Sequence, residues 1–212
     1  MTENIDVFTH SSIRIRGSLG SVYVDPFHMA EEPHDAAFIF VTHDHFDHFS
    51  PEDIAKVETE NTVLIVPEGM KEKAEKEIGS LVEIRTVVPG SSYEIGNLKF
   101  ETVSSYNKIK PFHPKHAGWV GYILQVNGQR IYIAGDTDAT AEAKQVQCDI
   151  ALVPVGGTYT MDAKQAAGLV NTIRPKTAIP THYGSVVGKQ EDACIFAEHV
   201  DGDISVEIRE LY

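Results

Sequence analysis

Apolar and polar residues alternate in many short runs along the chain, and this pattern predicts β-strands in every third of it. Residues 36–41 form a continuous apolar run, which is typical of a strand buried on both faces. Asn127-Gly128 between two such runs indicates a tight hairpin. The predicted strands are residues 5–9, 12–16, 21–24, 36–41, 62–66, 81–87, 92–95, 98–104, 120–126, 130–134, 149–155, 176–180 and 204–209.

Capping signals predict helices between several of these strands. Ser50 is a candidate N-cap, Pro51 suits the first helical position, and Asp53 stands where an acid completes the cap. Asp162 and Gln165 form a second pair of this kind. One predicted helix begins at residue 51, and the others cover residues 70–77, 140–147, 162–172 and 191–199. Many strands with interspersed helices predict an α/β or α+β sandwich.

Length and composition predict one ordinary globular domain. The chain has 212 residues, 42% hydrophobic and 23% charged, and we find no repeat or linker that divides it. Cys148 and Cys194 are too few for a disulfide framework and are expected to be buried thiols. The apolar runs are far shorter than the ~20 residues that span a bilayer, and the first ten residues do not resemble a secretion signal. We therefore expect a single cytoplasmic domain over residues 1–212 with no membrane span.

The charge of the chain narrows the choice of partners. Lysine and arginine total 18 against 31 acidic residues, a net charge of −13. Such an excess argues against long nucleic acids, whose binding depends on many lysine and arginine contacts to phosphates. A small molecule, even an anionic one, remains compatible because a bound cation can reverse the field locally. Composition is equally compatible with a monomer and an oligomer.

Candidate metal ligands crowd into the segment that follows the buried strand. His43, His45, Asp47 and His48 stand within six residues, and imidazole and carboxylate groups suit Zn²⁺. Alternate residues of an extended segment share a direction, so His43 and His45 can face one ion while Asp47 and His48 face a second. Four side chains cannot close two sites, so further ligands must come from later in the chain.

The run from His43 to His48 reads His-x-His-x-Asp-His and resembles the signature of the metallo-β-lactamase superfamily. Residues 10–12, residues 25–27 and an Asn…His-Pro…Gly-Trp run extend the resemblance over nearly the whole chain, toward a bacterial and archaeal branch of the superfamily. That branch includes the ascorbate-6-phosphate lactonases and, more distantly, the N-acyl-phosphatidylethanolamine phospholipases D. The resemblance implies an α+β fold, the four-layer αββα sandwich, with two mixed sheets face to face and helices outside.

The resemblance also implies three later ligands: a histidine in mid-chain, an aspartate after a strand and a late histidine. Asp136 and His182 each follow a predicted strand directly and fit the last two. Both His113 and His116 are candidates for the first. We favour His113, because the prolines on either side of it at positions 111 and 114 limit its backbone.

Two metal sites that share one carboxylate follow from the resemblance. The implied ligands are His43, His45 and His113 for one ion, Asp47, His48 and His182 for the other, and Asp136 as the bridge. Diiron oxygen-reducing relatives usually carry Glu at the place of His45, so zinc is favoured over iron, with Mn²⁺ or Ni²⁺ also compatible.

The implied activity is hydrolysis of an ester bond by a hydroxide that bridges the two metals. Asp47 would orient this nucleophile and carry its proton. The expected substrate is a small, possibly phosphorylated metabolite with a lactone or phosphodiester bond. A noncatalytic metal-binding scaffold and an iron-type redox module are the alternatives. Side chains that could contact substrate, although packing or loop structure would also explain each, are His10, Asn107, Lys115, Tyr159 and Tyr183.

Overall fold

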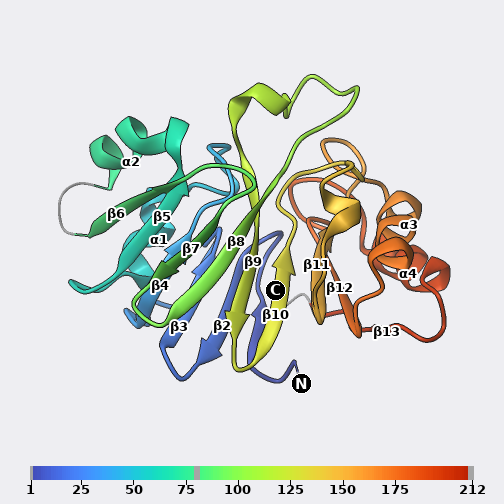
Figure 1. Cartoon of the computed structure of the whole chain (residues 1–212), viewed down its shortest axis with the longest axis horizontal. Coiled ribbons are helices and arrows are strands. Elements are labelled where there is room, and N and C mark those ends of the chain that lie inside the picture. The colour runs from blue at the N-terminus through green and yellow to red at the C-terminus, as the bar shows by residue number, and fades with distance from the viewer. Residues whose placement is uncertain (1, 79–81, 210–212) are drawn as a thin grey trace. The chain divides into compact units, whose positions relative to one another are not determined.

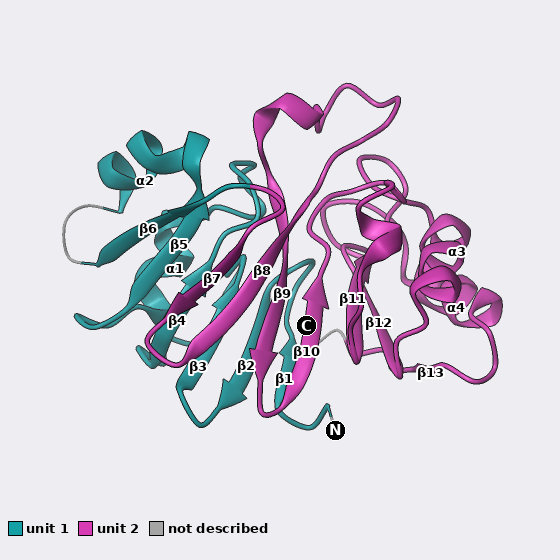
Figure 2. Cartoon of the chain, viewed as in Figure 1, with its two compact units in different colours: residues 1–88, 210–212 teal, residues 89–209 magenta. Residues whose placement is uncertain are grey.

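The computed structural model describes residues 2–78 and 82–209, which divide into two compact units (Figures 1 and 2). Unit 1 runs to Val88, and unit 2 runs from Pro89 to Arg209. Each unit has its own sheet, its own helices and its own hydrophobic core. None of the helices in the described ranges is both long and apolar enough to cross a bilayer. That the two units act as one domain over residues 1–212 stays a prediction.

Unit 1 is built on a six-stranded sheet in which strand order follows the chain, from β1 to β6. The first three strands are antiparallel, and the remaining three join them in parallel. The strands are β1 Ile5–Val7, β2 Ile13–Gly17, β3 Gly20–Val24, β4 Ala36–Phe40, β5 Val63–Pro67 and β6 Glu83–Val87. The helices are α1 Pro51–Val57 and α2 Lys71–Glu77, with a 3-10 turn, η1 Glu68–Met70.

The core of unit 1 forms where α1 and α2 pack against the parallel strands, as buried Ile54, Ala74 and Leu64 illustrate. Ser50 caps α1 as the sequence predicts, with its hydroxyl accepting from the amide of Asp53. The Asp53 carboxylate in turn accepts the backbone N–H groups of His28 and Met29, each at 2.9 Å. One capping acid therefore also fastens the segment after β3 to the start of α1.

Unit 2 is built on a seven-stranded sheet in the order β13-β12-β11-β10-β9-β8-β7. The strands are β7 Ser92–Ile95, β8 Leu98–Ser104, β9 Val120–Val126, β10 Gln129–Ile133, β11 Ile150–Pro154, β12 Thr177–Thr181 and β13 Ser205–Val206. β7 to β10 form an antiparallel meander, whereas β10 to β13 run parallel. The helices are α3 Ala163–Ile173 and α4 Gln190–His199, with the 3-10 turns η2 Lys115–Ala117 and η3 Ala143–Gln145.

Most predicted elements are confirmed within one or two residues at each end, and α3 carries the predicted capping box between Asp162 and Gln165. The predicted start of the strand at residues 81–87 falls partly on residue 81, which lies outside the described residues. The last strand, predicted at 204–209, is limited to β13, because only two residues pair with β12. Beyond it Arg209 turns back to Glu207, with Nε 2.6 Å from Oε2.

The helix predicted at residues 140–147 is wrong, although these residues favour helix locally. Only η3 forms, and the hydroxyl of Thr140 begins it by accepting from the amide of Ala143 at 3.0 Å. The chain is extended again at Val146. Ala143 and Val146 are both buried in the core of unit 2. A tight turn with three residues per turn, followed by extended chain, places both side chains on the core side.

Candidate metal centre

In unit 1 four predicted ligands lie on the loop between β4 and α1: His43, His45, Asp47 and His48. A turn fixes this loop, because the amide groups of His48 and Phe49 both donate to the carbonyl of His45, at 3.0 and 2.8 Å. His43, Asp47 and His48 are buried, and His45 is half-buried. A strand end on one side and a capped helix on the other therefore hold the predicted ligands on a short, anchored segment.

Asp25, at the end of β3, orients two of these imidazoles. Its carboxylate accepts Nδ1 of His48 at 2.7 Å, and it accepts the hydroxyl of Thr42 at 2.6 Å. Because that hydroxyl gives its single proton to Asp25, Nδ1 of His43, 2.9 Å away, must donate to Thr42. Both imidazoles then carry the proton on Nδ1 and the lone pair on Nε2, the arrangement usual for metal-binding histidines.

The role of Asp25 was missed by the sequence analysis, which noted it only within residues 25–27. Its backbone is left-handed, with φ of 47°, and its amide donates to the carbonyl of Phe40. Burial raises the pKa of this carboxyl, and the interactions with His48 and Thr42 oppose that rise. An Asp-Pro pair directly after a strand was the available signal, but its distance in sequence from His48 concealed the contact.

His10, predicted either to contact substrate or to fill the first hairpin, lies against a predicted ligand. Its Nε2 is 3.0 Å from Oδ2 of Asp47, and the same oxygen is 3.8 Å from Nε2 of His48. His10 is fully buried and left-handed, with φ of 66°. A non-glycine residue in this region costs backbone energy that the surrounding structure must offset, and such residues cluster at functional sites.

The other two ligands of unit 1 also converge. The rings of His43 and His45 meet edge to face with centroids 4.7 Å apart, and those of His43 and His48 are 4.0 Å apart. Nitrogen atoms of His43 and His45 lie within 4.8 Å of each other, as do the ligand atoms of His10, Asp47 and His48. Unit 1 thus holds two neighbouring groups of donors, as two ions would require.

In unit 2 two predicted ligands follow strand ends, and the third, His113, lies on the loop between β8 and β9. Asp136 follows β10, and its Oδ2 lies 3.1 Å from Nε2 of His182, which follows β12 directly. A nitrogen of His113 lies within 4.8 Å of a carboxylate oxygen of Asp136. Asp136 therefore stands close to both histidines, the position expected of a bridging ligand. His113 is fully buried against Trp119, whereas His116 is exposed on η2.

Gly156, just after β11, makes room for His182 to approach from the neighbouring strand. A Cβ at this position would lie 2.3 Å from the backbone oxygen of His182 and 3.4 Å from its Nδ1. His182 itself is left-handed, with φ of 60°. A side chain at position 156 would therefore displace the backbone that carries His182.

The remaining predicted contacts are also in unit 2. Asn107 donates from Nδ2 to the carbonyl of Tyr159 at 2.9 Å, so these two lie together. Lys115 is paired with Glu142, with 2.5 Å between Nζ and Oε1. Tyr183, which is next to His182, is buried within the core of the unit.

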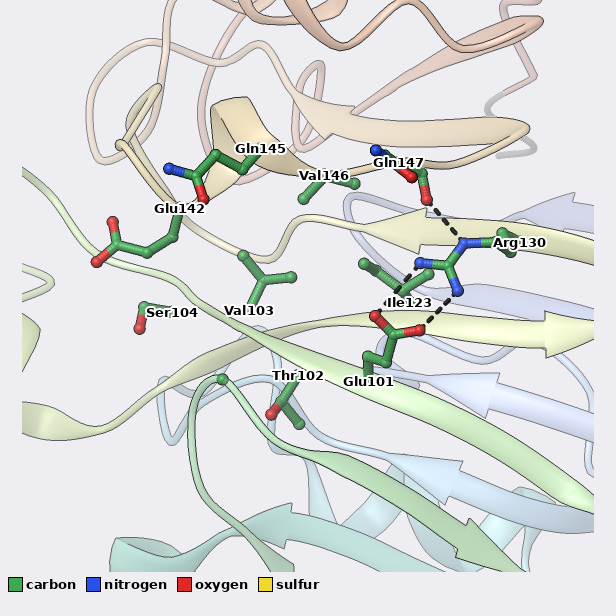
Figure 3. Close-up of a pocket in the computed structure, with 11 residues that line it drawn as sticks. Glu101, Thr102, Val103, Ser104, Ile123, Arg130, Glu142, Gln145, Val146 and Gln147 are labelled. Atoms are coloured by element: carbon green, nitrogen blue, oxygen red, sulfur yellow. Dashed lines mark hydrogen bonds and ion pairs between the residues drawn. The ribbon is translucent and has the colours of Figure 1, made fainter.

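A cavity of about 310 Å³ lies elsewhere in unit 2, over β8 and η3 (Figure 3). Two of its charged groups face each other: Arg130 donates to both oxygens of Glu101, at 2.6 and 3.3 Å, and to the carbonyl of Gln147 at 2.8 Å. The predicted ligands are not among the residues that line it. The guanidinium of Arg130 already has acceptors. This cavity lacks the converging imidazole and carboxylate groups of the predicted ligands.

Comparison with known proteins agrees with this fold. The model of the Beta-lactamase superfamily domain matches residues 4–182. A UPF0173 metal-dependent hydrolase of Symbiobacterium thermophilum is 30% identical over 206 residues, covering 90% of this chain and 88% of that protein. A crystal structure of a candidate metal-dependent hydrolase from Parabacteroides distasonis has a TM-score of 0.79 and 33% identity, and covers 98% of this chain and 93% of that one.

A more distant match has the same fold. Igni18, a metallo hydrolase from Ignicoccus hospitalis, has a TM-score of 0.78 at 20% identity, with 97% of this chain and 94% of that one covered. The predicted fold class, the α+β metallo-β-lactamase sandwich, is confirmed. The chain belongs to the metallo-β-lactamase superfamily and, within it, to the UPF0173 metal-dependent hydrolases.

Proposed function

We propose that this protein hydrolyses an ester bond of a small molecule with two divalent metal ions, zinc by preference. The relatives are named metal-dependent hydrolases, and the proposal extends that description to a bond type and a metal count. The proposed ligands are His43, His45 and His113 for one ion, Asp47, His48 and His182 for the other, and Asp136 as the bridge.

One observation carries the proposal: each unit presents buried donors that its own structure has already oriented. In unit 1, hydrogen bonds on Nδ1 of His43 and His48 place the lone pair of each ring on Nε2, the atom that would bind a metal ion. In unit 2, one carboxylate lies beside two histidines. Imidazole nitrogen and carboxylate oxygen, without thiolate, suit Zn²⁺ and also Mn²⁺ or Ni²⁺.

The chain's own residues complete the chemistry. Bound divalent ions would activate water at neutral pH and polarise the oxygen of the bond that breaks. Asp47 would orient the attacking water and accept its proton. His10, 3.0 Å from Oδ2 of Asp47, fixes the rotamer of that carboxylate. The bond would be a lactone or a phosphodiester, and the proposed location of the enzyme is the cytoplasm.

Metal analysis and a substrate panel test this proposal. Protein purified without chelator is analysed for bound metals, then assayed against lactones, carboxylic esters and phosphodiesters. We expect about two equivalents of metal, and hydrolysis that is lost with chelator and restored by Zn²⁺. Bound iron with consumption of oxygen would support the redox alternative instead. A fully metal-loaded protein inactive on every ester would support the scaffold alternative.

A further inference from the structure

The loop between β8 and β9, residues 105–119 and here called the His113 loop, is tied down at several points. It extends beyond the ends of both strands (Figure 1). The amide of Asn107 donates to the carbonyl of His113 at 2.7 Å and closes the loop on itself. Asn107 Nδ2 donates to the carbonyl of Tyr159 at 2.9 Å, and the amide of Lys108 donates to Asp138 Oδ2 at 2.8 Å. The tip of the loop is therefore presented in one conformation.

That tip carries two large apolar side chains in contact with solvent. Ile109 is 94% exposed, and Phe112 is 45% exposed and directly precedes the predicted ligand His113. Tyr159 packs edge to face against Phe112, with centroids 4.7 Å apart. An isolated exposed apolar residue needs no explanation. Here two of them lie on one anchored loop, Phe112 next to the predicted ligand His113 in sequence and Ile109 four residues before it.

The lysines of the same loop are engaged in holding it. Lys108 donates to the carbonyl of Ala139. Lys110 donates to Asp138 Oδ1 at 3.1 Å and also to the carbonyl of Thr160. Lys115 pairs with Glu142 at 2.5 Å. These cations already have acceptors, so the loop offers a substrate an apolar contact in preference to an anion site.

The size and position of this apolar surface limit what can bind to it. Specific protein interfaces bury about 800 Å² on each partner, whereas the apolar surface consists of Ile109, Phe112 and the edge of Tyr159. Ile109 and Phe112 share one loop with His113, so they lie on the same segment as a predicted ligand. We propose that Ile109 and Phe112 determine specificity by binding an apolar acyl, alkyl or aryl group of the ester. This inference rests on the proposed function and names its substrate class.

A homologous series of p-nitrophenyl esters gives the kinetic test. Burial of each methylene favours binding by roughly 0.8 kcal/mol at full burial, about fourfold. One-sided contact with the loop should give about half that energy, roughly twofold for each methylene. The hexanoate ester has four more methylenes than the acetate ester, so its KM should be about 16-fold lower. Ile109→Ser should remove most of this ratio, and Phe112→Leu should change it less.

Ile208 offers a matched control, because it is also an exposed isoleucine of unit 2, at 50% exposure, outside the His113 loop. Ile208→Ser should keep the wild-type ratio of KM values. An enzyme that hydrolyses both esters with equal KM, or an Ile109→Ser variant that keeps the wild-type ratio, would overturn the inference while leaving the proposed function intact.

Binding without turnover provides a second, independent readout. In protein labelled on isoleucine δ1-methyl groups, hexanoate should shift the Ile109 signal in a saturable way, propionate should shift it much less, and Ile208 should not move. This result in a protein that hydrolyses no ester would support the apolar contact and reject the proposed function. An Ile109 signal that ignores hexanoate, or responds only to phosphatidylcholine vesicles, would overturn the inference.

Discussion

The two units hold their candidate ligands by different means. In unit 1, four ligands share one short loop, and side chains orient them: Asp25 and Thr42 hold the imidazoles of His43 and His48. In unit 2, the candidate ligands come from two strand ends and a separate loop, and backbone geometry places them, with Gly156 leaving space beside His182. The loop in unit 1 should therefore be sensitive to loss of a polar partner, and unit 2 to any change in its backbone.

Removal of the carboxylate shared by the histidines of unit 2 should have the largest effect. Asp136→Ala takes away the oxygen that lies 3.1 Å from His182. We expect loss of one or both metals and of nearly all turnover, more than the roughly 10–100-fold loss typical when a supporting partner of a ligand is removed. Metal analysis of the folded variant provides the measurement. If the variant retained both metals, Asp136 would have no place among the ligands.

The mid-chain histidines should differ sharply. His113 is fully buried beside Asp136, so His113→Ala should lower both metal content and turnover. His116 is exposed, and surface substitutions generally change stability by no more than about 0.5 kcal/mol. Parallel metal analysis and kinetics of the two variants provide the comparison. The opposite order of severity would make His116 the ligand.

Gly156→Ala tests the backbone argument for unit 2 without replacing any predicted ligand. Its new Cβ would meet the backbone oxygen of His182 at 2.3 Å, so His182 must move. We expect a loss of about 1–3 kcal/mol in stability, as overpacking usually costs, together with weaker metal binding. Thermal unfolding with and without added metal measures both.

Gly168→Ala is the matched control, because nothing lies within 4 Å of a Cβ at that position in α3. Alanine favours a helix interior over glycine by up to about 1 kcal/mol, so this variant should be slightly more stable. Equal behaviour of the two alanine variants would remove the special role of Gly156.

Asp25→Asn tests the side-chain argument for unit 1. The amide can still accept a hydrogen bond from His48, but it removes the negative charge that supports that imidazole. We expect metal affinity to fall about 10–100-fold, the usual effect of changing the partner of a ligand histidine. A competition titration with a chelating dye measures this. Unchanged affinity would show that orientation by Asp25 is not needed.

The smallest expected effect is a difference in reactivity between the two thiols, Cys148 and Cys194. Burial and the nearby charge of Asp149 raise the pKa of Cys148 to about 12, with Arg130 opposing. Cys148 is half-buried and Cys194 is exposed on α4, so the expectation of two buried thiols is wrong. At pH 8 a disulfide reagent should therefore label one thiol quickly, and Cys194→Ser should abolish that fast phase. The slow reaction of Cys148 should accelerate as pH rises toward 12. Fast labelling that persists in Cys194→Ser would contradict this assignment.

The comparison also explains what could be predicted from sequence. His43, His45, Asp47 and His48 crowd into six residues, so the pattern is visible without a structure. Asp136 and His182 are single residues after strands and become candidates only by their order in a family. His10 was a candidate from the sequence, but its contact with Asp47, and that of Asp25 with His48, could not be predicted, because only the folded chain brings these residues together.

The error at residues 140–147 has the same origin at the level of secondary structure. Alanine, glutamate, lysine and glutamine favour helix locally, but burial of Ala143 and Val146 in the core decided the conformation. The capped helices α1 and α3 were predicted well because the signals that begin them lie within a few residues of each other.

The strand order of unit 2 has a consequence for how the protein matures during synthesis. β7 to β10 pair with their neighbours in sequence, so the ribosome releases a hairpin series that can assemble as it emerges. β11 and β12 reach their parallel partners only through long crossovers, whose closure entropy must be offset first. His182 is therefore the last of the predicted metal ligands to be synthesised, and it reaches its place only after β12 has joined the sheet.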